Sequence, residues 1–237
     1  MPFTPKAFDF LMENRLRNSR EWYQQHKEVF QREVLLPMQE LVRELEPFVV
    51  QVDPLFITEP RTDRTISRVY RDTRFSRDKS LYREVMWCTF KRDRNLYPGC
   101  PSLFVEVSPD GTRYGCGWYA ADPSLMEIMR ERVLAGDPLF LAADRALREQ
   151  TLFTLQGDKY KRPRHPEAPK ELWDWLDRKN VYISREEEDP QLVFSPALGK
   201  LVGERLLLLQ PIYQFFLQCT LLAVEREHSL RSAPPEF

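Results

Sequence analysis

The sequence has 237 residues, of which 42% are hydrophobic and 30% are charged, and its formal net charge is −1. This length and composition predict a folded globular chain that can bury a sizeable core. Because the chain is nearly neutral it has no overall basic field, so any affinity for nucleic acid or an anionic membrane must come from a local patch.

The amino-terminal part is predicted to be helical. It has no basic segment followed by an apolar run, so we expect no secretory signal. A first helix starts at Thr4 and Pro5, since a capping oxygen followed by a residue without an N–H suits a first helical turn. A second helix is expected from about Ser19, and Pro37 either kinks it or begins a third helix that runs to Pro47.

The middle of the chain has the composition of β-strands. Residues 65–73 and 85–91 are rich in β-branched and aromatic side chains. Two further strand-like runs flank residues 109–111, where proline presets one backbone angle and glycine tolerates a positive φ. Apolar side chains at 103, 105 and 107 share one face of the first run. We therefore expect an antiparallel sheet of three to five strands over residues 56–120.

Helices return in the second half, where Asp122 and Asp137 each precede a proline. This order of helices, sheet and helices predicts a single α+β domain over residues 1–237, with a central, mostly antiparallel sheet covered by amino-terminal and carboxy-terminal helices. We expect helices at residues 123–134, 138–149 and 167–178, short strands at 151–155 and 181–184, and one long or kinked helix from Ser195-Pro196 to about 228.

The most apolar segment, residues 206–224, is long enough to suggest a membrane span. However, Gln210, Gln214 and Gln218 recur every four residues and would line one helix face, and Pro211 interrupts the segment. We therefore expect a mostly buried helix and no membrane partner.

Cysteine and histidine spacing predicts neither disulfides nor a metal site. No two cysteines have CxxC spacing, which favours small buried side chains in a reducing cytoplasm. The histidines are isolated from one another and from the cysteines, so no zinc site is expected. The residues concerned are Cys88, Cys100, Cys116, Cys219, His26, His165 and His228.

Residues 115–120 match the nucleotide-binding pattern G-x-G-x-x-A, but the pattern requires a parallel strand, a tight turn and an immediate helix. Here it lies in the second arm of the expected antiparallel hairpin. The glycines more readily indicate a bulge or the close approach of another backbone or a ligand. The sequence has no GxSxG, Walker or HExxH motif, so we expect no cofactor and leave the catalytic residues open.

A basic segment at residues 61–83 contains eight basic and three acidic residues, and eight minus three gives a local charge of +5. Seven of the eight are arginines, whose planar guanidinium binds phosphate or carboxylate through two parallel hydrogen bonds. Interleaved apolar and aromatic residues, including Val69, Tyr70 and Phe75, are expected to hold the segment against the fold. The basic residues are Arg61, Arg64, Arg68, Arg71, Arg74, Arg77, Lys79 and Arg83.

This segment resembles a bacterial and fungal family of conserved hypothetical proteins, a domain of unknown function with the pattern R-x-x-R-D-x-R-F-S-x-D-K-x-P-Y. The chain departs from the pattern at Leu81, where the family has proline. The resemblance covers nearly the whole chain and implies a single intracellular α+β domain. The matching residues are Arg68, Arg71, Asp72, Arg74, Phe75, Ser76, Asp78, Lys79 and Tyr82, with Phe8, Leu11, Asn14, Trp22, Pro37, Gly115, Gly117, Trp118, Leu125, Ile128 and Arg130 elsewhere.

The leading hypothesis is a cytoplasmic domain that binds a small anionic molecule, a phosphate or a carboxylate. Arginines and a lysine would bind the anion, two aspartates would orient them, and two aromatic residues would form a wall. Strand alternation places Arg71 opposite Arg68 and Arg74, so the three converge only if the strand bends or ends near Asp72. The expected ligand-binding residues are Arg68, Arg71, Asp72, Arg74, Asp78, Lys79, Tyr82 and Trp118.

Two alternatives remain open from the sequence. The charges could form an ion-pair network that holds the sheet together and binds no ligand. Alternatively, an exposed basic face could bind nucleic acid or a protein, with an affinity that falls steeply with salt. The sequence leaves the oligomeric state open.

Overall fold

The computed structural model describes residues 2–118, 121–187 and 189–232. The chain forms two compact units, each described here by itself. The single domain expected from the sequence stays a prediction. The first unit contains residues within Met1–Phe90, Leu103–Tyr114 and Glu186–Leu207, and the second contains residues within Lys91–Ser102, Gly115–Arg185 and Leu208–Phe237.

The helical start of the first unit is confirmed. The first helix follows Thr4, with proline in its first turn, but the predicted capping hydrogen bond is absent: the Thr4 hydroxyl donates to Glu33 at 3.4 Å instead. The second is capped by Ser19, whose hydroxyl accepts a hydrogen bond from the backbone N–H of Trp22 at 3.3 Å. The helical elements are α1 (Pro5–Arg17), α2 (Arg20–Gln25), α3 (Lys27–Val29), the π-helix η1 (Phe30–Leu35) and α4 (Leu36–Val52).

Helix α4 settles the role of Pro37 and corrects the predicted end at Pro47. Pro37 lies in the first turn, where its missing N–H breaks no helical hydrogen bond. Pro47 lies inside the helix, which continues to Val52. Val49 and Val52 are buried and extend the apolar stripe of the preceding turns, so their burial outweighs the hydrogen bond lost at Pro47.

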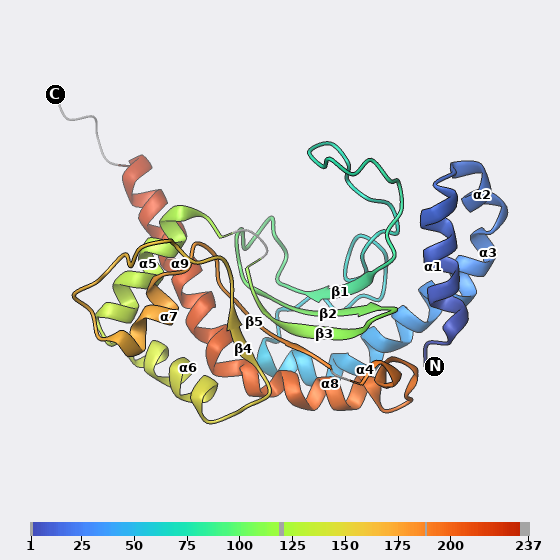
Figure 1. Ribbon diagram of the computed structural model, residues 1–237. Coiled ribbons are helices and arrows are strands. Elements are labelled where there is room, and N and C mark those ends of the chain that lie inside the picture. Colours follow the sequence, from blue (N-terminus) through green and yellow to red (C-terminus); the bar gives the residue numbers. More distant parts are fainter. Residues whose placement is uncertain (1, 119–120, 188, 233–237) are drawn as a thin grey trace. The chain divides into compact units, whose positions relative to one another are not determined.

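A five-stranded antiparallel sheet with strand order β1-β2-β3-β5-β4 gives the chain its α+β class, as predicted. Helices α4 and α8 (Leu198–Leu206) lie along one face of β1–β3 (Figure 1). β1, β2 and the start of β3 belong to the first unit, and the end of β3, β5 and β4 belong to the second. The strands are β1 (Met86–Phe90), β2 (Ser102–Ser108), β3 (Gly111–Gly117), β4 (Thr154–Gln156) and β5 (Tyr182–Glu186).

The hairpin between β2 and β3 follows the sequence prediction closely. Leu103, Val105 and Val107 are buried, and the side chains between them are half-buried. Gly111 has a φ of 133°, a value that a side chain would strain.

In the second unit, helices α5 and α6 begin where they were predicted. Asp122 and Asp137 cap them by accepting hydrogen bonds from the backbone N–H groups of Ser124 (2.7 Å) and Leu139 (2.8 Å). The buried rings of Phe140 on α6, Trp175, and Phe215 and Phe216 on α9 pack together. The helices concerned are α5 (Pro123–Leu134), α6 (Pro138–Arg148) and α9 (Gln210–Ser232).

The helix predicted over residues 167–178 is much shorter. The structure has a 3-10 turn, η2 (Lys170–Leu172), followed by one helical turn, α7 (Trp173–Leu176). The helix ends there because the next two side chains bind other backbone segments. Asp177 accepts a hydrogen bond from the N–H of Arg164 (2.8 Å), and Arg178 donates to the carbonyl oxygens of Gly157 and Leu155, both at 2.8 Å.

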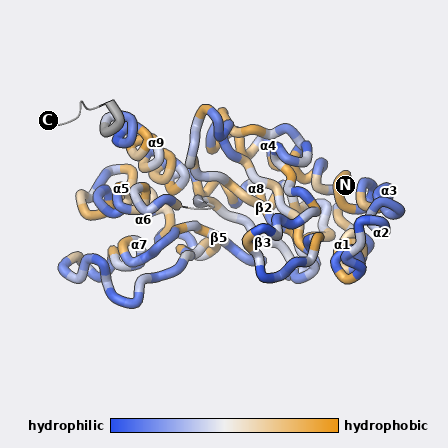
Figure 2. Tube along the Cα trace, turned by 90° about the horizontal axis from the view of Figure 1, so that it is seen from above, coloured by the Kyte–Doolittle hydropathy of each residue, from blue (hydrophilic) through white to orange (hydrophobic). Residues whose placement is uncertain are grey.

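The closing helix begins later than predicted and is interrupted. A 3-10 helix, η3 (Pro190–Phe194), precedes Ser195, whose hydroxyl accepts the N–H of Ala197 at 3.1 Å, so the helix starts two residues after Pro196. It consists of α8 (Leu198–Leu206), the 3-10 turn η4 (Leu207–Leu209) and α9. Along α9, hydrophobic positions give way to hydrophilic ones toward the carboxyl end (Figure 2).

Among the described residues, the span Leu198–Ser229 is long and apolar enough to cross a membrane by length and composition, and 44% of its most apolar window is buried. Core helices of soluble proteins meet the same criterion, so the finding is weak. Gln210 is exposed and Gln214 and Gln218 are half-buried, which agrees with the polar face predicted for them.

The glycines of β3 allow β5 to approach closely, as one sequence alternative predicted. A Cβ atom on Gly115 would lie 1.9 Å from the carbonyl oxygen of Ile183, and one on Gly117 would lie 2.4 Å from the Cβ of Tyr182. Both glycines belong to an antiparallel strand, which does not have the geometry of a dinucleotide fingerprint. The last two residues of the G-x-G-x-x-A pattern, at 119 and 120, lie outside the described residues.

We predict that Gly115→Ala destabilises the protein by about 2 kcal/mol or more, because the new methyl group collides with the backbone of β5. The measurement is the free energy of unfolding in urea. Gly136→Ala is the control. Its Cβ would meet open space, so it should lose only the roughly 1 kcal/mol of backbone strain at φ +63°. Equal losses in the two variants would contradict the close approach.

Candidate functional site

The basic segment forms a loop on a short antiparallel stem, which lies in the first unit. The N–H of Arg71 donates to the carbonyl of Leu81 (2.8 Å), and the N–H of Arg83 donates to the carbonyl of Val69 (2.9 Å). Tyr70 and Tyr82 form the bridge between the two sides. We call residues 69–71 and 81–83 the stem and residues 72–80 the basic loop, which extends away from the sheet as the teal loop in Figure 1.

The strand predicted over residues 65–73 is wrong: within these residues the structure has isolated bridges at Ile66 and Tyr70 and no strand of the sheet. The reason is local. The carboxylate of Asp72 accepts a hydrogen bond from the N–H of Arg74 (3.1 Å), and that of Asp78 accepts one from the N–H of Ser80 (2.9 Å). Aspartates that bind the backbone two residues ahead favour turns over extended strands. The chain thus turns at Asp72, the position at which the sequence required a bend.

Tyr82 anchors the stem against α2. Its ring is fully buried and packs on the rings of Tyr23 (centroids 5.3 Å apart) and Tyr70 (5.0 Å). Its hydroxyl donates to the carbonyl oxygen of Ser19 at 3.4 Å. Burial raises the pKa of the Tyr23 hydroxyl to about 12 and raises that of Tyr82 as well. These tyrosines are therefore neutral anchors at physiological pH.

Asp78 joins the basic loop to helix α1. Its carboxylate pairs with Arg71, and also with Nη2 of Arg15 at 3.3 Å. The hydrogen bond from the backbone of Ser80, followed by that from Arg71, holds the pKa of Asp78 well below its usual value. The Arg71 side chain is only 20% exposed and also donates to the hydroxyls of Ser80 and Ser76. Arg71 therefore uses three of its five guanidinium N–H donors on protein groups.

Sequence reasoning missed two α1 residues that complete this attachment. Arg15 forms an ion pair with Glu84 (Nε to carboxylate oxygen, 3.2 Å) in addition to pairing with Asp78. Asn18 ends α1 with φ 48°, a left-handed conformation that asparagine tolerates, and its side-chain oxygen accepts the N–H of Leu81 at 2.6 Å. An asparagine after the last helical turn is a visible helix-end signal, but its partner 63 residues away is not.

The exposed part of the basic loop has a different character. The Arg74 side chain is 77% exposed and pairs with Asp72, and its hydrogen bonds are the leading cause that lowers the Asp72 pKa to about 2. Lys79 donates to the carbonyl oxygen of Thr73 at 2.8 Å, so its charge is not neutralised by that contact. Phe75 is 96% exposed, with the Arg74 guanidinium 5.8 Å from its ring centre. Within the described part of the chain, the exposed Arg77 makes no hydrogen bond or ion pair.

The remaining expected site residues lie apart from this loop. Arg68, before the stem, is exposed and pairs with Asp63. Trp118 belongs to the second unit, where it is buried against Phe216 (ring centroids 4.4 Å apart) and donates to the hydroxyl of Thr220 at 3.1 Å. The structure thus brings Arg71, Asp72, Arg74, Asp78, Lys79 and Tyr82 together on one stem and loop, and gives Arg68 and Trp118 other partners.

The described residues provide neither a metal-binding group nor an activated cysteine for this site. Residues 2–118, 121–187 and 189–232 contain no group of three or more His, Cys, Asp or Glu side chains placed to hold a metal ion. The four cysteines are free thiols. Burial raises the pKa of Cys88 and of Cys219 to about 12, so neither is an activated thiolate.

A family model described as Conserved hypothetical protein (DUF2461) matches residues 6–215. The match includes α1, the stem, the basic loop and most of the second unit. No curated protein and no solved structure matches the chain.

We predict that Asp78→Asn lowers stability at pH 7 and that its difference from the wild type shrinks in acid. An aspartate whose pKa is lower in the folded than in the unfolded protein stabilises the fold above the unfolded pKa, about 3.9. That contribution is lost as the pH falls through the still lower folded pKa. Urea unfolding between pH 7 and pH 2 measures it, with Asp110→Asn, on the β2–β3 turn, as the control. A difference that stays constant down to pH 2 would contradict the proposed attachment.

Proposed function

We propose that this chain, which belongs to the family described as Conserved hypothetical protein (DUF2461), binds single-stranded nucleic acid on the exposed part of the basic loop. The single observation that carries the proposal is the nearly complete exposure of Phe75 among three cationic side chains. An exposed aromatic ring is costly in water, and a ring among cations suits the alternating bases and phosphates of a single strand.

An extended anion fits this arrangement better than the small anion expected from the sequence. A small phosphate or carboxylate needs several donors that converge on one point. Here Arg68, Arg71 and Arg74 each pair with a different carboxylate, and Arg71 also donates to the hydroxyls of Ser80 and Ser76. Single-stranded nucleic acid instead offers a row of phosphates, and each cation of the loop can bind a different one.

The ion pairs of the loop do not prevent such binding. Arg74 and Asp72 are both exposed, and an exposed pair is worth only about 0–1 kcal/mol. A phosphate can therefore replace Asp72 at little cost. Arg77 and Lys79 need no exchange, because neither is paired with a carboxylate within the described residues.

The rest of the chain limits the strength of binding. With a net charge of −1, the protein has no global field to concentrate an anionic ligand, so affinity depends on the loop alone. The free cysteines agree with a reducing cytoplasm, which we propose as the place where the protein works.

The test is fluorescence anisotropy with a labelled single-stranded oligonucleotide in 50 mM and 200 mM salt. With three phosphate contacts, from Arg74, Arg77 and Lys79, the fourfold rise in salt should weaken binding about twentyfold. Phe75→Ala should weaken binding about tenfold or more through lost stacking, with an unchanged melting temperature. Lys200→Gln, which removes an exposed cation from α8, is the charge-matched control for Arg77→Gln and should bind as the wild type does.

Three outcomes would overturn the proposal. The first is an oligonucleotide affinity that Phe75→Ala and Arg77→Gln leave intact. The second is stabilisation by inorganic phosphate or a nucleotide without any oligonucleotide binding, which would restore the small-anion hypothesis. The third is the absence of all these effects, which would leave the basic segment with a structural role.

A further inference from the structure

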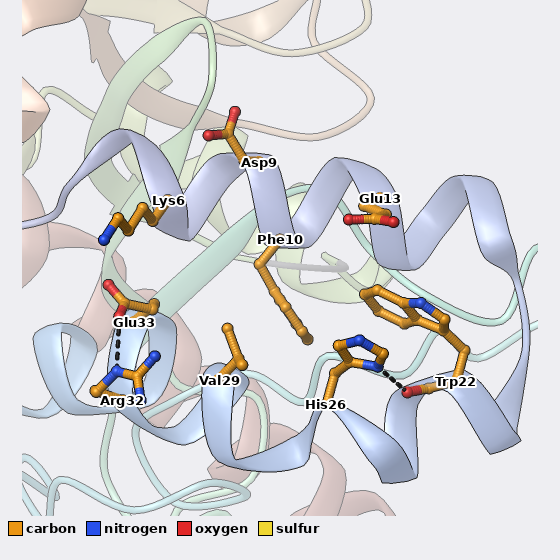
Figure 3. Close-up of a pocket in the computed structure, with 9 residues that line it drawn as sticks. All are labelled: Lys6, Asp9, Phe10, Glu13, Trp22, His26, Val29, Arg32 and Glu33. Carbon is orange, nitrogen blue, oxygen red and sulfur yellow. Dashed lines mark hydrogen bonds and ion pairs between the residues drawn. The ribbon is translucent and has the colours of Figure 1, made fainter.

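A second feature of the first unit is independent of the basic loop. A pocket of about 230 Å³ lies between α1 and the segment that runs from α2 to η1 (Figure 3). Phe10, Trp22 and Val29 form its apolar wall. Pockets for drug-sized ligands usually measure about 300–1,000 Å³, so this one suits a single side chain better than a cofactor.

The hydrogen bond of His26 defines what the pocket offers to a ligand. The imidazole stacks on the Trp22 indole with centroids 4.1 Å apart, and its Nδ1 lies 2.8 Å from the carbonyl oxygen of Trp22. A carbonyl only accepts, so Nδ1 carries a proton. In the neutral ring Nε2 is then a hydrogen-bond acceptor, and Figure 3 shows this second nitrogen turned toward Glu13.

The charges around the pocket favour a cation. At one end, Lys6 and Arg32 surround Glu33, which accepts a hydrogen bond from Arg32 at 2.7 Å. That hydrogen bond is the leading cause that lowers the Glu33 pKa. Glu13 lies at the other end, and Asp9 lies between the two ends on α1 with its carboxylate turned away from the α2–η1 segment (Figure 3).

The two carboxylates on α1, those of Asp9 and Glu13, are only weakly neutralised by basic side chains. Glu13 pairs with Arg17 at 3.2 Å, but both side chains are more than half exposed, so the pair contributes little. Asp9 makes no ion pair or hydrogen bond among the described residues. Two cations against three carboxylates leave the lining with a charge of −1 when His26 is neutral.

We infer that this pocket binds the arginine side chain of a basic peptide. The guanidinium donates to the Glu13 carboxylate and to Nε2 of His26, in the attractive field of Asp9. Its planar fork of five N–H donors can reach two acceptors at once, which an ammonium does less well. The aliphatic stem lies against Phe10, Trp22 and Val29.

The backbone beside the pocket agrees with a binding role. Arg32 and Glu33 lie in η1, a π-helical stretch of six residues inside an otherwise α-helical region. Such stretches are rare and frequently occur at functional sites. This one carries the basic end of the pocket and ends where α4 begins.

The experiment titrates the full-length protein with N-acetyl-arginine amide, followed by NMR signals of the Trp22 indole and the His26 ring. The neutral isostere N-acetyl-citrulline amide is the ligand control. We expect saturable shifts with the arginine compound and at least tenfold weaker binding of the citrulline compound. Glu13→Gln should weaken arginine binding at least tenfold, whereas Glu21→Gln, an equal charge change on α2 outside the pocket, should leave it unchanged.

A short arginine peptide and free arginine distinguish the source of the ligand. Tighter binding of the peptide supports a peptide partner, and tighter binding of free arginine overturns that part of the inference. Equal binding of citrulline, an undiminished affinity in Glu13→Gln, or the absence of shifts at Trp22 and His26 would overturn the inference as a whole. Melting temperatures of the two variants confirm that both are folded.

Discussion

The carboxylate of Asp78 is the interaction on which the geometry of the basic loop depends. It takes one hydrogen bond from its own loop, one from Arg71 in the stem and one from Arg15 on α1. A carboxylate has enough acceptor sites for all three. Because these donors come from different parts of the first unit, one side chain sets both the turn of the loop and its attachment to the helix.

This attachment divides the charged residues into two groups. Arg71 and Asp78 pair with each other within the fold, and the buried Tyr82 anchors the stem to Tyr23. Phe75 and Arg77 have no such role, and they remain exposed. The structural and functional explanations of the basic segment therefore apply to different residues. The stem, which Tyr82 anchors, presents the exposed basic loop, whose side chains are available to a partner.

Much of the fold could be predicted because its signals are local. Proline after a residue typical of helix caps marked the starts of α1, α5 and α6, and alternating apolar residues marked β2. The predictions were wrong where contacts between residues distant in the sequence determine where a helix ends. Burial of Val49 and Val52 carries α4 through Pro47, and the bonds of Arg178 to a neighbouring strand shorten the helix at α7.

The candidate site was predictable in composition but not in geometry. The sequence identified Arg71 and Asp78, yet it could not pair them, since eight basic and three acidic residues allow many pairings. Arg15 and Asn18 were missed because nothing local marks their partners. Asp72 and Asp78 could have predicted the turns, because an aspartate whose side chain accepts a hydrogen bond from the backbone N–H two residues ahead favours a turn.

The most direct test of the account is a double-mutant cycle on Arg71 and Asp78. Urea unfolding at pH 7 would be measured for the wild type, Arg71→Gln, Asp78→Asn and the double variant. If the two side chains stabilise the loop through each other, the losses in the single variants should fail to add. Losses that add to within about 0.5 kcal/mol would contradict the attachment of the basic loop through Asp78.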